Sequence, residues 1–87
     1  MLAHPAFVSK IPGIEIRKDY DGEYYLSYPL DFGTALEVEE EEGIIYIVFR
    51  KWNMSHALTE EIDIAECSVR EPSRAIALIL TAISNNT

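Results

Sequence analysis

Apolar and polar positions alternate along much of the chain with the two-residue period of a β-strand. Residues 14–17 alternate isoleucine with charged residues, and residues 24–28 resume the alternation after the turn signal Asp21-Gly22. Successive side chains of a strand point to opposite faces, so each run predicts a strand with one apolar face. Together they predict a hairpin.

The register of this hairpin follows from the faces of its strands, because a slip of one residue would move every side chain to the opposite face. A three-residue loop at 20–22, with Gly22 in the left-handed conformation of a bulged turn, pairs Ile16 with Leu26. That register places Tyr25 on the opposite face.

A second hairpin follows the interruption at Pro29 and Gly33. Residues 36–39 alternate, Glu42-Gly43 is a turn signal, and residues 44–49 are continuously apolar. A run of β-branched and aromatic residues that is apolar on both faces is typical of a central strand.

The last part of the chain predicts a late strand and a helix. Residues 61–65 alternate, with Ile62 and Ile64 expected to face the core. Pro72 suits the first position of a helix, which would make Glu71 the N-cap and would extend the helix over 72–85.

These elements predict an α+β fold: a single antiparallel sheet of four to five strands (two consecutive hairpins plus a late strand) packed against one C-terminal helix. We expect one domain, 1–87, comprising an extended N-terminal arm at 1–12, the sheet at 13–67 and the helix at 72–85. The prolines Pro5 and Pro12 favour the extended arm. One helix covers one face of a sheet, so the other face needs the arm, a concave wrap or a second copy, and we expect a homodimer.

Composition and charge narrow the function classes. The 87 residues include 48% apolar residues and a single cysteine, which suits one small core without an internal disulfide. Fifteen acidic residues against seven basic ones give a formal charge of −8, which disfavours direct contact with nucleic acid or anionic lipid. The longest apolar run, 75–83, is too short to span a membrane, and we expect a cytoplasmic protein with a basic protein partner.

Acidic residues near the predicted turns are the main candidates for partner binding, because a hairpin would hold their carboxylates in solvent on a rigid support. Tyr25 and Trp52 are candidate aromatic anchors. An ordinary solvated hairpin, whose glutamates guard a sheet edge against aggregation, explains the same pattern. The acidic candidates are Asp19, Asp21, Glu23, Glu37, Glu39, Glu40, Glu41 and Glu42.

Other motifs are weaker. The ligand spacing at 19–23 is too compressed for a calcium loop, so we predict no metal site and no cofactor. The cluster at 50–52, Arg-Lys-Trp, is the one compact basic and aromatic group. His4, His56 and Cys67 lie far apart in sequence, and no signature places a nucleophile beside a base, so we predict no catalytic residues and a protein that is not an enzyme.

Residues 16–29 have a charged strand, an Asp-Gly turn, an aromatic strand and then a proline. This segment resembles the opening hairpin of HicB-type antitoxins over about a sixth of the chain. That family continues with a Gly-x-Thr segment and an amphipathic helix, whereas here Gly33-Thr34 leads into an acidic hairpin. The resemblance implies a toxin-binding role as one alternative.

The sequence thus favours a small acidic inhibitor that occupies a basic, nucleic-acid-handling site on a larger protein. Rows of carboxylates can imitate nucleic acid, as in anti-defence or anti-CRISPR-like proteins of phages. The alternatives are a homo-oligomeric assembly subunit and an antitoxin-like protein.

Overall fold

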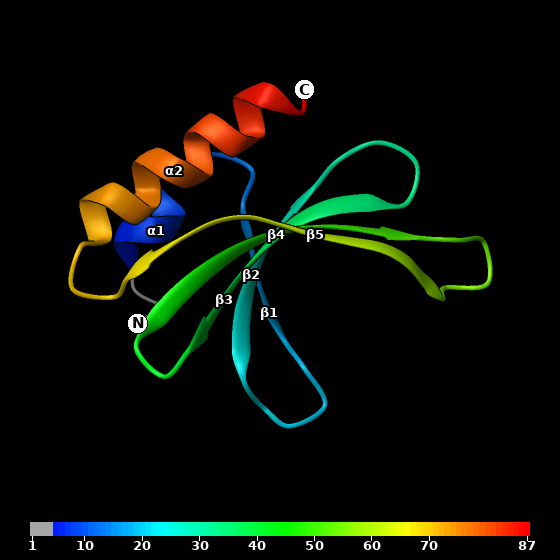
Figure 1. Ribbon diagram of the computed structural model, residues 1–87, viewed down its shortest axis with the longest axis horizontal. Coiled ribbons are helices and arrows are strands. Elements are labelled where there is room, and N and C mark those ends of the chain that lie inside the picture. Colours follow the sequence, from blue (N-terminus) through cyan, green and yellow to red (C-terminus); the bar gives the residue numbers. More distant parts are fainter. Residues whose placement is uncertain (1–4) are drawn as a thin grey trace.

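A computed structural model describes residues 5–87, which form a five-stranded antiparallel sheet and two helices (Figure 1). The strand order is β1-β2-β3-β4-β5, so each strand pairs with its neighbours in the chain. The α+β prediction is therefore confirmed. The elements are α1 (Pro5–Lys10), β1 (Glu15–Lys18), β2 (Tyr24–Pro29), β3 (Thr34–Glu41), β4 (Ile44–Trp52), β5 (Leu58–Ser68) and α2 (Pro72–Asn85).

The N-terminal segment differs from the extended arm expected at 1–12, whose first four residues lie outside the described part. Residues Pro5–Lys10 form helix α1. A proline at the first helical position lacks only an N–H that would be unpaired anyway, and Pro12 follows the helix end. The two prolines therefore bound a short helix. Phe7 and Ile11 are buried in the core, as the apolar pattern of the segment required.

The register of the first hairpin and the turn of the second match the sequence prediction. Ile16 pairs with Leu26, and Gly22 has a φ of 82° in the loop that precedes β2. In the second hairpin Glu41 pairs with Ile44, which leaves Glu42-Gly43 as a two-residue turn. Both turn residues have positive φ, 50° and 82°, as a type I′ turn requires.

The core lies between the sheet and the two helices, which sit on the same side of the sheet (Figure 1). Leu36 and Val38 of β3 and Ile45 and Ile47 of β4 are fully buried in it. Helix α2 matches the predicted bounds and has Glu71 as its N-cap. Its buried residues are Ala75, Ile76, Ile79 and Ala82.

Strand β5 differs from the prediction in its length and in the burial of its isoleucines. Ile62 and Ile64, expected to face the core, are 48% and 40% exposed. Two features explain this: β5 is an edge strand whose hairpin with β4 projects beyond the helices (Figure 1), and a register shift lies between Ile47 and Val48. Ile64 is the residue left without a partner in that shift, as in a β-bulge.

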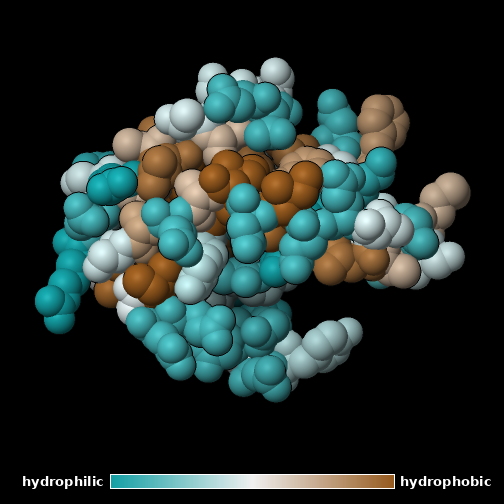
Figure 2. All heavy atoms as spheres, in the orientation of Figure 1, coloured by the Kyte–Doolittle hydropathy of each residue, from teal (hydrophilic) through white to brown (hydrophobic). Residues whose placement is uncertain are grey.

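The face of the sheet opposite the helices is concave and does not present an open apolar surface. Val48 and Ala35, on that face, are only 2% and 6% exposed. The strands twist so that the projecting hairpins curl around this face (Figure 1). In the space-filling view, apolar residues gather near the centre, beside α2 (Figure 2). The curled face is the concave wrap that the sequence left as one option.

None of the helices among residues 5–87 has the length and apolar character needed to cross a membrane.

Candidate functional site

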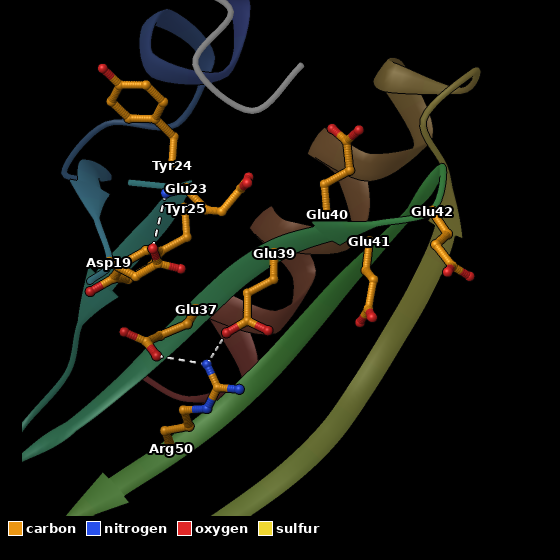
Figure 3. Close-up of a pocket in the computed structure, with 10 residues that line it drawn as sticks. All are labelled: Asp19, Glu23, Tyr24, Tyr25, Glu37, Glu39, Glu40, Glu41, Glu42 and Arg50. Carbon is orange, nitrogen blue, oxygen red and sulfur yellow. Dashed lines mark hydrogen bonds and ion pairs between the residues drawn. The ribbon is translucent and has the colours of Figure 1, made fainter. Parts of the chain in front are cut away.

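The larger hollow of the curled face gathers acidic residues from two consecutive hairpins. It has a volume of about 590 Å³ and lies between the β1–β2 loop and the β3–β4 hairpin (Figure 3). Seven of its ten lining residues are acidic and Arg50 is the single cation among them. We call it the acidic hollow; its acidic lining residues are Asp19, Glu23, Glu37, Glu39, Glu40, Glu41 and Glu42. The Glu40 side chain points away from those of Glu39 and Glu41, as alternation along β3 requires (Figure 3).

Local hydrogen bonds hold the β1–β2 rim of the acidic hollow in place. The Asp19 carboxylate accepts the backbone N–H groups of Asp21 and Glu23, each at 2.9 Å. The Asp19 N–H also donates to the Glu23 carbonyl at 3.0 Å. An Asp side chain that bonds its own backbone in this way stabilises a turn, so the loop presents Asp19 and Glu23 from a fixed backbone.

Arg50 is the centre of the floor of the hollow. Its Nη1 donates to Glu37 at 2.9 Å and also to Glu39, and its Nε donates to Glu61 at 2.7 Å. The register causes this arrangement, because Arg50 lies opposite Ala35 on β3 and opposite Glu61 on β5. Three carboxylates from two neighbouring strands thus surround one guanidinium.

The electrostatics of this cluster favour the charged state of Arg50. Burial acts to lower the pKa of Arg50, but its hydrogen bonds to Glu39, Glu37 and Glu61 outweigh that effect and raise the pKa above its usual range. The cluster has three negative charges for one positive charge, a net charge of −2. The floor of the hollow is therefore rigid and still negative.

A second, smaller hollow adjoins the first on the same face. It has a volume of about 330 Å³, and Tyr25 and Trp52 are its aromatic lining residues. Arg17 and His56 also line it, and Tyr25 and Glu37 are common to both hollows. We call it the aromatic hollow; the other lining residues are Ser27, Pro29, Gly33, Thr34 and Ala35.

The predicted site residues fall into three groups. Residues 39–42, together with Asp19, Glu23 and Glu37, line the acidic hollow. Trp52 lines only the aromatic hollow, and Tyr25 lines both. Asp21 is exposed at the loop and lines neither.

Glu37 and Glu39 differ in character from the solvated carboxylates expected of a hairpin tip. Both lie within β3, and Glu37 is 7% exposed. Their bonds to Arg50 make them structural members of the floor. The solvent-facing carboxylates of the hollow are those of its rim, among them Glu23, Glu41 and Glu42.

Sequence reasoning missed the ion-pair partners of the site. Arg50 was grouped with Lys51 and Trp52, but neighbouring residues of a strand face opposite sides, so Lys51 points away from the other two. Glu61, which was not among the candidate site residues, also binds Arg50. The turn at Glu42-Gly43 fixes the register that brings Arg50 and Glu37 to one face. That register was the signal in the sequence from which the ion pair could have been predicted.

The remaining reactive groups lie apart from the hollows or at their margin. Cys67 is buried against α2, where burial and the nearby Glu71 carboxylate raise the pKa of its thiol, opposed by Arg74. Across residues 5–87, no three His, Cys, Asp or Glu side chains are grouped in a way that could hold a metal ion.

No protein-family model matches the chain, and neither the curated proteins nor the solved structures contain a significant match to it.

Proposed function

We propose that this chain is a non-enzymatic, acidic protein-binding module whose acidic hollow takes a basic surface of a larger, nucleic-acid-handling protein. One observation carries the proposal: two consecutive hairpins bring seven acidic residues to the lining of one hollow, with Arg50 as the single cation among the lining residues. A formal charge of −8 on 87 residues extends the negative field beyond the hollow. Such a field attracts basic surfaces and repels nucleic acid.

The attraction resides mainly in the rim of the hollow. Glu37 and Glu39 are engaged with Arg50, so they offer a partner less charge than a row of solvated carboxylates would. Glu23, Glu41 and Glu42 are exposed and come from both hairpins. A concave wall of low dielectric constant strengthens their combined field. A partner with lysines or arginines that normally contact phosphate would fit this rim, which is the action of an inhibitor of the anti-defence type.

The test is capture of the partner from a lysate of the native host at low salt, with mass spectrometry of the retained proteins. A triple variant, Glu23→Gln, Glu41→Gln and Glu42→Gln, removes rim charge without touching the Arg50 cluster. A matched variant, Glu60→Gln, Asp63→Asn and Glu66→Gln, removes equal charge from β5, outside both hollows.

The expected result is a basic protein that the native chain and the β5 variant retain and the rim variant loses. Addition of the native chain should also displace nucleic acid from that protein, and salt should weaken the complex because exposed charges are screened within about 8–10 Å. Equal retention by all three chains would contradict the proposal. Retention of a toxin in place of a nucleic-acid-handling protein would favour the antitoxin-like alternative.

A further inference from the structure

The aromatic hollow shares two lining residues with the acidic hollow, which makes the two parts of one groove. Tyr25 on β2 and Glu37 on β3 line both. A ligand that follows the curled face therefore passes from carboxylates to aromatic rings without leaving the surface of the sheet.

The chemistry of the aromatic hollow suits an apolar ring. Its apolar lining comes from Tyr25, Trp52, Pro29 and Ala35. Its charged lining residues are engaged elsewhere, since Arg17 binds Glu15 at 3.0 Å and Glu37 binds Arg50. A volume of about 330 Å³ is at the lower end of ligand sites, which suits a side chain of a peptide. Aromatic walls favour an aromatic guest, since rings attract one another in offset and edge-to-face arrangements.

The backbone forms this hollow in advance of any ligand. The Trp52 N–H donates to the Gly33 carbonyl at 2.9 Å. Gly33 has a φ of 71°, and a Cβ at Gly33 would lie 2.9 Å from the Trp52 carbonyl oxygen. The β2–β3 loop and the end of β4 thus meet as closely as backbone allows. This contact holds the backbone at Trp52 in place, which lowers the ordering cost when a ligand binds.

We propose that the groove binds an extended segment of the basic partner, with an aromatic side chain between Tyr25 and Trp52 and adjacent lysines or arginines among the carboxylates of the acidic hollow. This inference rests on the proposed function and specifies the ligand. Charge complementarity selects such a segment over a second copy of this chain, which would bring a further −8 into the negative field.

The test uses the full chain and two short synthetic peptides that differ at one position. Both consist of lysines and arginines; one has a central phenylalanine and the other has alanine there. Trp52 is the one tryptophan of the chain, so its fluorescence reports directly on the aromatic hollow. Affinity is measured at low salt by calorimetric titration with each peptide, which does not depend on the Trp52 signal, for the native chain, the rim variant, Trp52→Leu, Trp52→Ala and Tyr20→Ala. Tyr20 is a fully exposed aromatic residue that lines neither hollow, which makes it the matched control.

The phenylalanine peptide is expected to bind about tenfold more tightly than the alanine peptide and to change the Trp52 fluorescence. That advantage should vanish in Trp52→Leu and persist in Tyr20→Ala. The alanine peptide should bind the native and Trp52→Leu chains equally, which also shows that the variant is folded.

Three results would overturn the inference in distinguishable ways. If both peptides bind equally and the rim variant loses both, the proposed function stands and the aromatic anchor is wrong. If the phenylalanine advantage persists in both Trp52 variants, the ring binds elsewhere. If neither peptide binds the native chain, the proposed function and this inference both fall.

Discussion

Among single residues, Arg50 has the central structural role on the curled face. It joins β3 and β5 through Glu37, Glu39 and Glu61, and its side chain is 17% exposed. Removal of one member of a buried ion pair leaves an uncompensated charge, which costs more than the pair itself contributes. The stability of the floor therefore depends on the Arg50 guanidinium, because it compensates the charges of the surrounding glutamates.

Replacement of Arg50 by methionine should lower the free energy of unfolding by about 2–3 kcal/mol, because Glu37 would stay buried without a cation. Urea denaturation measures the change. The matched control is Arg17→Gln, which breaks an exposed pair with Glu15 and should cost under about 1 kcal/mol. Equal losses in the two variants would show that the cluster is no more important than a surface pair.

Cys67 should react slowly with thiol reagents in the folded chain. Burial and Glu71 raise the pKa of its thiol, so little of the reactive thiolate is present near pH 8. The rate of alkylation is compared between the folded chain and the chain in urea, with the double variant Cys67→Ala and Ile64→Cys as an exposed-thiol control. Equal rates for the native and control thiols would contradict the burial of Cys67.

The same shift gives a pH dependence of stability. A folded-state pKa above the unfolded value means that the folded chain binds the proton more tightly. The contribution of Cys67 is fully present below the ordinary thiol pKa of about 8.5 and is lost as the pH rises through the folded value. Cys67→Ala should remove this alkaline dependence.

Among the secondary-structure elements, the β3–β4 hairpin has a feature that works against its own stability. Glu42 occupies the first central position of the turn with a φ of 50°. That conformation favours glycine and asparagine, and a residue with a longer side chain is strained there. A glutamate at this position adds a carboxylate to the rim of the acidic hollow, which is consistent with selection for charge over local stability.

Glu42→Asn should therefore stabilise the chain by about 0.5–1 kcal/mol while weakening the capture of a basic partner. Thermal or urea denaturation measures stability, and the low-salt capture measures binding. Glu41→Asn is the control, since Glu41 lies in β3, where asparagine is unfavourable. A loss of stability in Glu42→Asn would show that the glutamate side chain itself stabilises the turn.

At the scale of the whole molecule, part of the apolar surface that remains exposed lies on β5 and α2. Ile62 and Leu80 are 48% and 41% exposed, and both belong to the helix side of the sheet. The opposite face, for which the sequence left the N-terminal arm, a concave wrap or a second copy as options, is concave and carries the Arg50 cluster. The homodimer stays a prediction, and its interface would involve β5.

A dimer of this kind should dissociate when a charge is placed on β5. Light scattering over a range of concentrations should show a dimer for the native chain and a monomer for Ile62→Lys. Met54→Lys, at a fully exposed apolar residue between β4 and β5, should leave the native behaviour unchanged. A strict monomer for the native chain at high concentration would refute the dimer.

Where the sequence pattern was local, it determined the structure. The alternation at 14–28, the turn glycines and Pro72 fix strand faces, hairpin registers and the start of α2, because each depends on neighbouring residues alone. The same local reasoning was wrong for residues 5–10, since prolines that exclude a long helix also suit the two ends of a short one.

Only the tertiary structure decided which residues meet at the site and which residues of β5 are buried. Whether Ile62 and Ile64 are buried depends on how far the helices extend over the sheet. The meeting of Asp19 and Glu23 with the glutamates of β3 depends on how strongly five strands twist and curl. The negative charge and the acidic composition could be read from the sequence. The pairing of three glutamates with Arg50 and the groove beside Trp52 could not, because they arise from contacts between different strands.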